Sequence, residues 1–253
     1  MVGESVTEEL VHLATAGGIA TITLDSPHNR NALSRQLVSE LFDRLEATAT
    51  DDAVRVVVLR SADRVFCSGA DLSEAAGGSM TEGAGALVEL QRVILTHPKP
   101  IVTRLGGPVR AGGLGIVASS DLVICGDDVT FALTESRLAL APAVISLTLI
   151  PRLTSRAAYD TFLSGRTFDA AEAAGMGLVT RSVPAAELDA AVDEACAELL
   201  KAHPQGLRET KKILARDLLA YLEANAEEMI ALSARLFGSD EAREAMVAFL
   251  TKK

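Results

Sequence analysis

The most informative stretch of the sequence is Phe66-Cys67-Ser68-Gly69-Ala70-Asp71-Leu72, and its counterpart is Gly106-Gly107-Pro108-Val109-Arg110-Ala111-Gly112-Gly113. Both loops place small residues between an expected strand and an expected helix. Small residues let a ligand approach the backbone closely, and the N–H groups of a first helical turn have no partner within the helix. One N–H group from each loop can therefore converge on an oxygen that gains negative charge, which would make an oxyanion hole.

Alternating strands and helices surround the two loops. The patterns predict strands at Ile19–Leu24, Val54–Leu59, Ile101–Leu105, Asp121–Cys125 and Val129–Leu133, and helices at Ser34–Ala49, at Glu82–Thr96 and from the second loop to Ser120. The run from Val54 to Leu59 is almost wholly apolar, as expected of a strand buried on both faces. Strand–helix alternation of this kind predicts an α/β fold with much parallel sheet.

The last third of the chain is expected to be helical. Helices are predicted at Arg156–Leu163, after an Asp169 cap, at Ala185–Ala202, at Pro204–Ala226 and at Ser239–Thr251. Their apolar faces cannot be stable in isolation. We therefore expect these helices to pack on the core or on a neighbouring subunit.

Composition excludes several classes of protein. Hydrophobic residues make up 49% of the 253-residue chain, which is enough for one large domain or for a core domain with a helical appendage. The net charge of −10 and the scarcity of aromatic rings argue against nucleic-acid binding. The short basic pair Lys211-Lys212 is expected on a solvated helix face.

The cysteines and the N-terminus bear on metal binding and location. The three cysteines form no CxxC pair, so neither a zinc site nor a disulfide framework is expected. Met1–Leu10 lacks the apolar segment of a signal peptide, and no apolar run is long enough to span a membrane. We expect a cytoplasmic protein that does not associate with membranes.

The first loop resembles the F-[SCA]-[AS]-G-A-D-[LI] signature of the crotonase superfamily, to which enoyl-CoA hydratases and isomerases belong. Other stretches resemble further family motifs in the same order: Asn29–Leu33, Lys99–Asp121, Phe131–Glu135 with Pro142, and Ser164–Val179. The match spans almost the whole chain. The resemblance implies a crotonase (ClpP-like) spiral core of repeated ββα units over residues 1–190. It also implies a C-terminal helical trimerisation region over residues 191–253, in a homotrimer or a hexamer made of two trimers.

The resemblance further implies an acyl-CoA substrate, with coenzyme A entering as part of the substrate and with no separate cofactor or metal. The backbone N–H groups of Ala70 and Gly112 would form the oxyanion hole that holds the thioester oxygen. The resemblance places further substrate-binding positions at Asn31, Ala32, Ser68, Gly69, Asp71, Leu72, Gly113 and Pro142.

The same resemblance indicates which acid/base residues of the family are present in this sequence. Hydratases of the family carry two glutamates, but Gly115 stands at the position of the first. The second is present as Glu135, which we expect to exchange a proton with the α-carbon. Burial near an acyl chain would raise the pKa of this carboxyl.

Four functions follow from this count. The first choice is an enoyl-CoA hydratase that uses a single glutamate. The alternatives are a Δ3-Δ2-enoyl-CoA isomerase, which needs only one acid/base group, a methylglutaconyl-CoA hydratase-like enzyme, and a non-catalytic acyl-CoA-binding homologue. In the third case an inward-facing Arg110 would pair with a substrate carboxylate, although a loop arginine more commonly faces solvent or another subunit.

Overall fold

The computed structural model describes residues 8–74 and 80–251. The first seven residues, on which the expected lack of a signal peptide partly rests, lie outside this description. Within the described ranges no helix is both long and apolar enough to cross a membrane.

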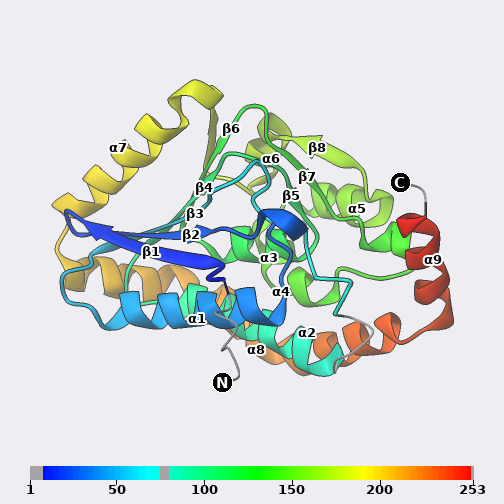
Figure 1. Cartoon of the computed structure of the whole chain (residues 1–253). Helices are drawn as coiled ribbons and strands as arrows, with labels where there is room; N and C mark the ends of the chain where they lie inside the picture. The colour runs from blue at the N-terminus through cyan, green and yellow to red at the C-terminus, as the bar shows by residue number, and fades with distance from the viewer. Residues whose placement is uncertain (1–7, 75–79, 252–253) are drawn as a thin grey trace, which may run out of the picture.

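A six-stranded sheet forms the centre of the molecule, in the order β1-β2-β3-β4-β6-β9 (Figure 1). Its strands are β1 (Val11–Ala16), β2 (Ile19–Leu24), β3 (Val56–Ser61), β4 (Ile101–Leu105), β6 (Leu122–Gly126) and β9 (Arg181–Val183). Only the β1–β2 pair is antiparallel, and the other neighbours in this sheet are parallel. The predicted strands at residues 19–24 and 101–105 are confirmed with the same first and last residues. The ends of β3 and β6 lie within two residues of the predicted ends.

Strand β3 is buried on both faces, as its apolar run predicts. Val56 and Val58 share one apolar cluster with helix α7, whereas Val57 and Leu59 belong to the larger core on the opposite face. Successive side chains of a strand point to opposite faces, so one run of valines and leucine joins two layers of helices through the sheet.

A second sheet of three short strands stands beside the first, in the order β5-β7-β8. Its strands are β5 (Val109–Arg110), β7 (Thr130–Ala132) and β8 (Thr167–Asp169). Val109 pairs with Phe131, and Phe131 pairs with Phe168, whose ring stacks on it at 5.5 Å between centroids. The pairing of β5 with β7 brings the second glycine loop alongside the segment that leads to Glu135.

Helices cover both faces of the large sheet. The α-helices of the described residues are α1 (Arg35–Thr50), α2 (Met80–Thr96), α3 (Gly112–Ser119), α4 (Ala143–Arg152), α5 (Ser155–Ser164), α6 (Ala170–Met176), α7 (Leu188–Lys201), α8 (Pro204–Phe237) and α9 (Asp240–Leu250), of which α9 lies away from the sheet and contacts α8. Figure 1 shows α7 on one side of the sheet and α1, α2 and α8 on the other. The domain boundary expected after residue 190 falls within α7, whose buried residues Leu188, Val192 and Cys196 pack on the sheet.

Local capping explains where several helices begin. The Ser34 side chain accepts a hydrogen bond from the Leu37 N–H, and Ser239 caps α9 in the same way through Ala242. Asp169 and Glu172 form the predicted capping box at α6. Sequence patterns did not predict α4, because nearly all of its residues are buried and no polar face marks a helical period.

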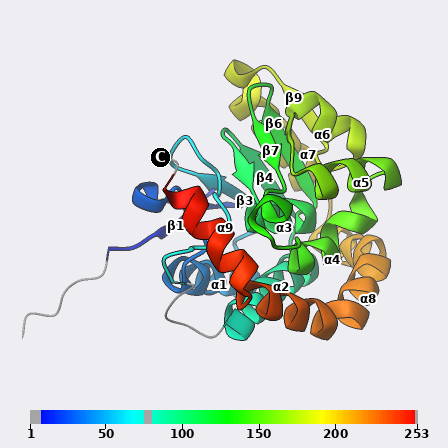
Figure 2. The same ribbon diagram turned by 90° about the vertical axis from the view of Figure 1, so that its right-hand side faces the viewer.

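The long helix α8 packs on the core of its own chain, against α2 and α4 (Figure 2). Lys211 anchors it. The expectation of a solvated lysine pair is wrong for this residue, because its ammonium is buried and donates to Asp121 Oδ2 at 2.7 Å and to the Ile94 carbonyl at 2.9 Å. Lys212, one residue on, is exposed and pairs with Glu209. The sequence pattern of α8 could not predict this burial, because it depends on contacts of Lys211 with Ile94 and Asp121, which are far away in the chain.

Replacing Lys211 with methionine should lower the free energy of unfolding by about 3 kcal/mol, because the Asp121 carboxylate would remain buried without its cation. Lys212→Met is the matched control, and we expect a change within about 0.5 kcal/mol. Urea denaturation of both variants measures the difference. Equal stabilities of the two variants would show that the buried ion pair does not anchor α8.

Candidate active site

Three short backbone pairings hold the two glycine loops together. Leu33 pairs with Ala70, and Cys67 pairs with Val109, both as isolated parallel bridges. Val109 also pairs with Phe131 in β5 and β7. The loop after residue 66, the loop before α3 and the segment before Glu135 are therefore fixed in one row by backbone hydrogen bonds.

The N–H groups of Ala70 and Gly112 remain available within this row. Ala70 is exposed and Gly112 is the first residue of α3, where an N–H has no partner in the helix. Across the described residues, neither group donates a hydrogen bond to another part of the chain. A Cβ built on Gly69 would lie 3.6 Å from the Gly112 nitrogen, so the two loops are in direct contact.

Backbone strain is stored where the second loop enters α3. Ala111 has φ 45° and ψ −122°, a backbone conformation that residues other than glycine rarely adopt. The Ala111 N–H donates to the Ala132 carbonyl, which fixes the residue in place. Gly69 faces it with φ 98°, and a Cβ there would come within 2.8 Å of the Ala111 Cβ. Strained backbone of this kind is common at functional sites, where the surrounding structure enforces it.

Glu135 begins the 3-10 helix η2 (Glu135–Leu138), three residues after β7 ends. Its Oε2 is buried and has no hydrogen-bond partner among the residues that the structure describes. Burial raises the pKa of this carboxyl to about 7, which is opposed only by a hydrogen bond with its own backbone. A carboxyl with this pKa can both take and give a proton near neutrality.

A cavity of about 610 Å³ joins these groups and is called the catalytic cavity below. Eight of the predicted site residues line it: Ala32, Ser68, Ala70, Asp71, Leu72, Gly112, Glu135 and Pro142. The remaining three, Asn31, Gly69 and Gly113, do not line it. Asn31 is fully buried, where it accepts from the Ser26 N–H and donates to the Val65 carbonyl. Gly113 lies against Cys67, where a Cβ would come within 2.7 Å of the cysteine Cβ.

Sequence reasoning missed several residues of the cavity wall. Leu87 of α2, Val144 and Ile145 of α4, and Ser233 and Phe237 of α8 all line it. The helical period of α2 marked Leu87 as a buried position, but no local signal indicates that α8 reaches the cavity from about 100 residues further along the chain.

The position of the absent first glutamate is filled by neighbouring side chains. A Cβ built on Gly115 would lie 2.9 Å from Ile145 Cγ2 and 3.2 Å from the side-chain amide carbon of Gln91. Gln91 is fully buried, donates to the Leu87 and Val144 carbonyls, and accepts from the Thr148 hydroxyl at 2.6 Å. Because these bonds hold Gln91 firmly, the packing around Gly115 leaves no room for a second carboxylate there.

Arg110 lies on the wall of the catalytic cavity, where it is half-buried. Its guanidinium donates to the Val109 carbonyl and to both the carbonyl and the hydroxyl of Thr130. Burial lowers its pKa from the usual value. In the described structure Arg110 therefore joins β5 to the start of β7 through neutral acceptors.

No group of three or more His, Cys, Asp or Glu side chains within residues 8–74 and 80–251 is placed to hold a metal ion. The three cysteines are free and buried, and burial raises the pKa of the Cys67 thiol to about 12. Among the carboxyl groups that line the catalytic cavity, Asp71 has a lowered pKa, whereas Glu135 has a raised one.

Comparison with known proteins agrees with this architecture. The model of the enoyl-CoA hydratase/isomerase family matches residues 14–253. The crystal structure of an enoyl-CoA hydratase from Mycobacterium avium superposes with a TM-score of 0.91 at 43% identity, covering 98% of each chain.

Two curated relatives are more distant. The hydroxycinnamoyl-CoA hydratase-lyase of Pseudomonas fluorescens is 31% identical over 93% of this chain and 90% of its own length. Enoyl-CoA delta isomerase 2 of Rattus norvegicus is 30% identical over 99% of this chain and 66% of its own length.

A spiral-like α/β core with paired glycine loops and long C-terminal helices defines an enzyme of the crotonase type. The chain belongs to the enoyl-CoA hydratase/isomerase family, whose members bind acyl-CoA substrates.

Replacing Gly115 with alanine should lower the free energy of unfolding by about 1–3 kcal/mol, because the new methyl group would press on Ile145 and Gln91. Gly85→Ala in α2 is the control: a Cβ there meets nothing within 4 Å, and alanine should stabilise the helix by up to about 1 kcal/mol. Urea denaturation gives both values. A stabilising Gly115→Ala variant would show that the space is not filled.

Replacing Glu135 with glutamine should stabilise the protein, and the gain should depend on pH. Because the folded-state pKa is raised to about 7, wild-type stability falls as pH rises from the ordinary glutamate value towards 7. The advantage of the glutamine variant should grow over that window, reach on the order of 3 kcal/mol and then stay constant. Thermal melting at pH 5 and pH 8 tests this, and a gain that is equal at both would contradict the raised pKa.

Proposed function

We propose that this chain moves the double bond of 3-enoyl-CoA thioesters to the 2-position, with Glu135 as its single acid/base residue. The observation that carries this proposal is the buried, unpartnered Oε2 of Glu135, which lines the same cavity as Ala70 and Gly112. The packing at Gly115 supports a mechanism with one carboxylate, and we therefore propose isomerisation rather than the hydration that we predicted first from the sequence.

The reaction needs one base and one site for negative charge. The Glu135 carboxylate removes a proton from C2, and the electron pair moves onto the thioester oxygen to form a dienolate. The N–H groups of Ala70 and Gly112 stabilise that oxygen because they point at it without reorganising. The Glu135 carboxyl then returns the proton to C4, which leaves the double bond between C2 and C3.

Hydration of 2-enoyl-CoA is the second candidate. The solved structure that is 43% identical to this chain is that of an enoyl-CoA hydratase, which favours it. Adding water requires a base for the water and an acid for C2. Glu135 could serve both needs only if one water bridged its carboxyl group and the substrate.

The expected homotrimer or hexamer stays a prediction. Large apolar side chains on the surface support it: Tyr159, Leu163 and Leu214 are 65%, 75% and 77% exposed, respectively. These side chains lie on α5 and α8, and large apolar groups in water are candidates for burial between subunits.

The central experiment follows the absorbance of the conjugated thioester. With 3-hexenoyl-CoA we expect the signal to rise, and kcat/KM should increase with pH and level off above about 7, because the base must be ionised. Glu135→Gln should lower kcat by roughly 10²- to 10⁴-fold. Glu223→Gln, an exposed change on α8, should have no effect.

Two results would contradict the proposal. Full activity of Glu135→Gln would remove Glu135 from the mechanism. If the absorbance of the conjugated thioester falls with 2-hexenoyl-CoA and does not rise with 3-hexenoyl-CoA, the enzyme is a hydratase and not an isomerase.

A further inference from the structure

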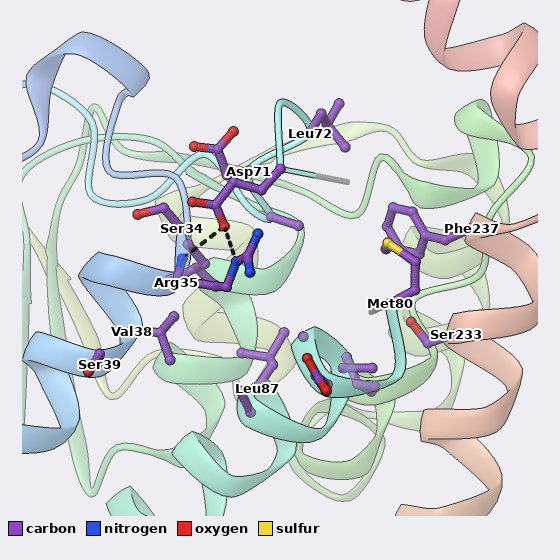
Figure 3. Close-up of a pocket in the computed structure, with 18 of the residues that line it drawn as sticks. Ser34, Arg35, Val38, Ser39, Asp71, Leu72, Met80, Leu87, Ser233 and Phe237 are labelled. Carbon is purple, nitrogen blue, oxygen red and sulfur yellow. Dashed lines mark hydrogen bonds and ion pairs between the residues drawn. The ribbon is translucent and has the colours of Figure 1, made fainter. Parts of the chain in front are cut away.

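A second cavity of about 380 Å³, called the side cavity here and drawn in Figure 3, shares part of its wall with the catalytic cavity. Ala70, Leu87, Val144 and Phe237 line both cavities. A volume of this size is within the range of small-molecule sites. Since Ala70 offers one of the two N–H groups, a thioester held there has the side cavity next to its acyl group.

The inner walls of the side cavity are apolar. Leu33, Val38 and Phe42 come from α1 and the turn before it, Leu87 comes from α2, and Phe237 comes from the end of α8. Figure 3 shows Phe237 beside Met80 on one side, opposite Asp71 and Leu72, with Val38 and Leu87 below. These surfaces favour hydrocarbon and offer little to a hydrated group.

The charged groups of the side cavity are mostly acidic, and three serines, Ser34, Ser39 and Ser233, also line it. Asp71, Glu74 and Glu82 line it, against the single guanidinium of Arg35. Glu74 already accepts from the Arg35 N–H at 3.0 Å and forms an ion pair with its guanidinium at 3.5 Å. Asp71 accepts from Asn29 and from Ser73, which favours its ionised form.

We propose that the side cavity holds the acyl tail of the substrate and selects a neutral, apolar chain over one that ends in a carboxylate. The inference rests on the proposed function, because it takes Ala70 as the anchor of the thioester oxygen. An alkyl tail gains from leaving water. A terminal carboxylate would lose hydration and meet the carboxylates of Asp71 and Glu74, while the nearby Arg35 guanidinium is already paired with Glu74.

Arg110 is the competing partner for a substrate carboxylate. It lines the catalytic cavity but not the side cavity, and its guanidinium is bound to Val109 and Thr130. Pairing with a substrate would require at least part of this arrangement to change. A preference for dicarboxylyl thioesters that depends on Arg110 would therefore overturn the proposal.

The test measures binding of saturated thioesters, which the enzyme cannot isomerise. Calorimetric titration should show hexanoyl-CoA binding at least tenfold more tightly than adipoyl-CoA, which has the same number of acyl carbons and a terminal carboxylate. From acetyl- to hexanoyl-CoA, affinity should rise by up to about fourfold per methylene. Equal or tighter binding of adipoyl-CoA would overturn the proposal, and Arg110→Gln would then show whether Arg110 holds the carboxylate.

Two variants locate the tail. Val38→Phe fills the side cavity, so hexanoyl-CoA should bind at least tenfold less tightly while acetyl-CoA changes by less than twofold. Phe237→Ala widens it, so the ratio of decanoyl-CoA to butanoyl-CoA affinity should rise. Glu223→Ala, an exposed change on the same helix as Phe237, is the control. If neither cavity variant changes the chain-length dependence, the tail does not lie in the side cavity.

Failure of this inference is distinguishable from failure of the proposed function. A flat chain-length series with intact isomerisation of 3-hexenoyl-CoA would refute the side cavity alone. A steep series without isomerisation would refute the proposed reaction and leave the acyl site standing. Thermal melting of each variant checks that it folds, and the wild-type series decides the question even if Val38→Phe does not fold.

Discussion

The backbone pairing between the two glycine loops is the constraint on which the rest of the site depends. The Cys67–Val109 bridge holds the loops side by side, and the Leu33–Ala70 bridge fixes the outer edge of the first. The large parallel sheet sets where each loop emerges, because β3 precedes the first loop and β4 precedes the second, and these strands are neighbours. The positions of the Ala70 and Gly112 N–H groups, which we propose as the oxyanion hole, depend on this register more than on any side chain.

The surroundings of Glu135 and of Gly115 differ in their polar contacts. At Glu135 the chain buries a carboxyl whose Oε2 has no hydrogen-bond partner among the described residues, and burial raises the pKa of this group. At Gly115 the chain instead buries a glutamine whose hydrogen bonds are satisfied by α2 and α4. An ionisable carboxyl is therefore present at Glu135, whereas the space beside Gly115 is occupied by the hydrogen-bonded side chain of Gln91.

Sequence patterns predicted most of the fold because apolar periodicity and capping residues act locally. The strands at residues 19–24 and 101–105, the Asp169 capping box and the helical last third were all readable in this way. The pairings of β5 and β8, the burial of Lys211 and the filling of the space at Gly115 were not, because each depends on residues far away in the chain. For the site, motif matches indicated Ala70, Gly112 and Glu135, but nothing local placed Phe237 beside them.

The walls of the catalytic cavity come from residues as far apart as Asn29 and Phe237. The ribosome therefore has to synthesise nearly all of the chain before the cavity can close, since Phe237 lies at the end of the 34-residue helix α8. A nascent chain that stops before α8 is complete would carry both glycine loops and Glu135 without the wall that shields them from water. The cavity is thus completed only late in synthesis.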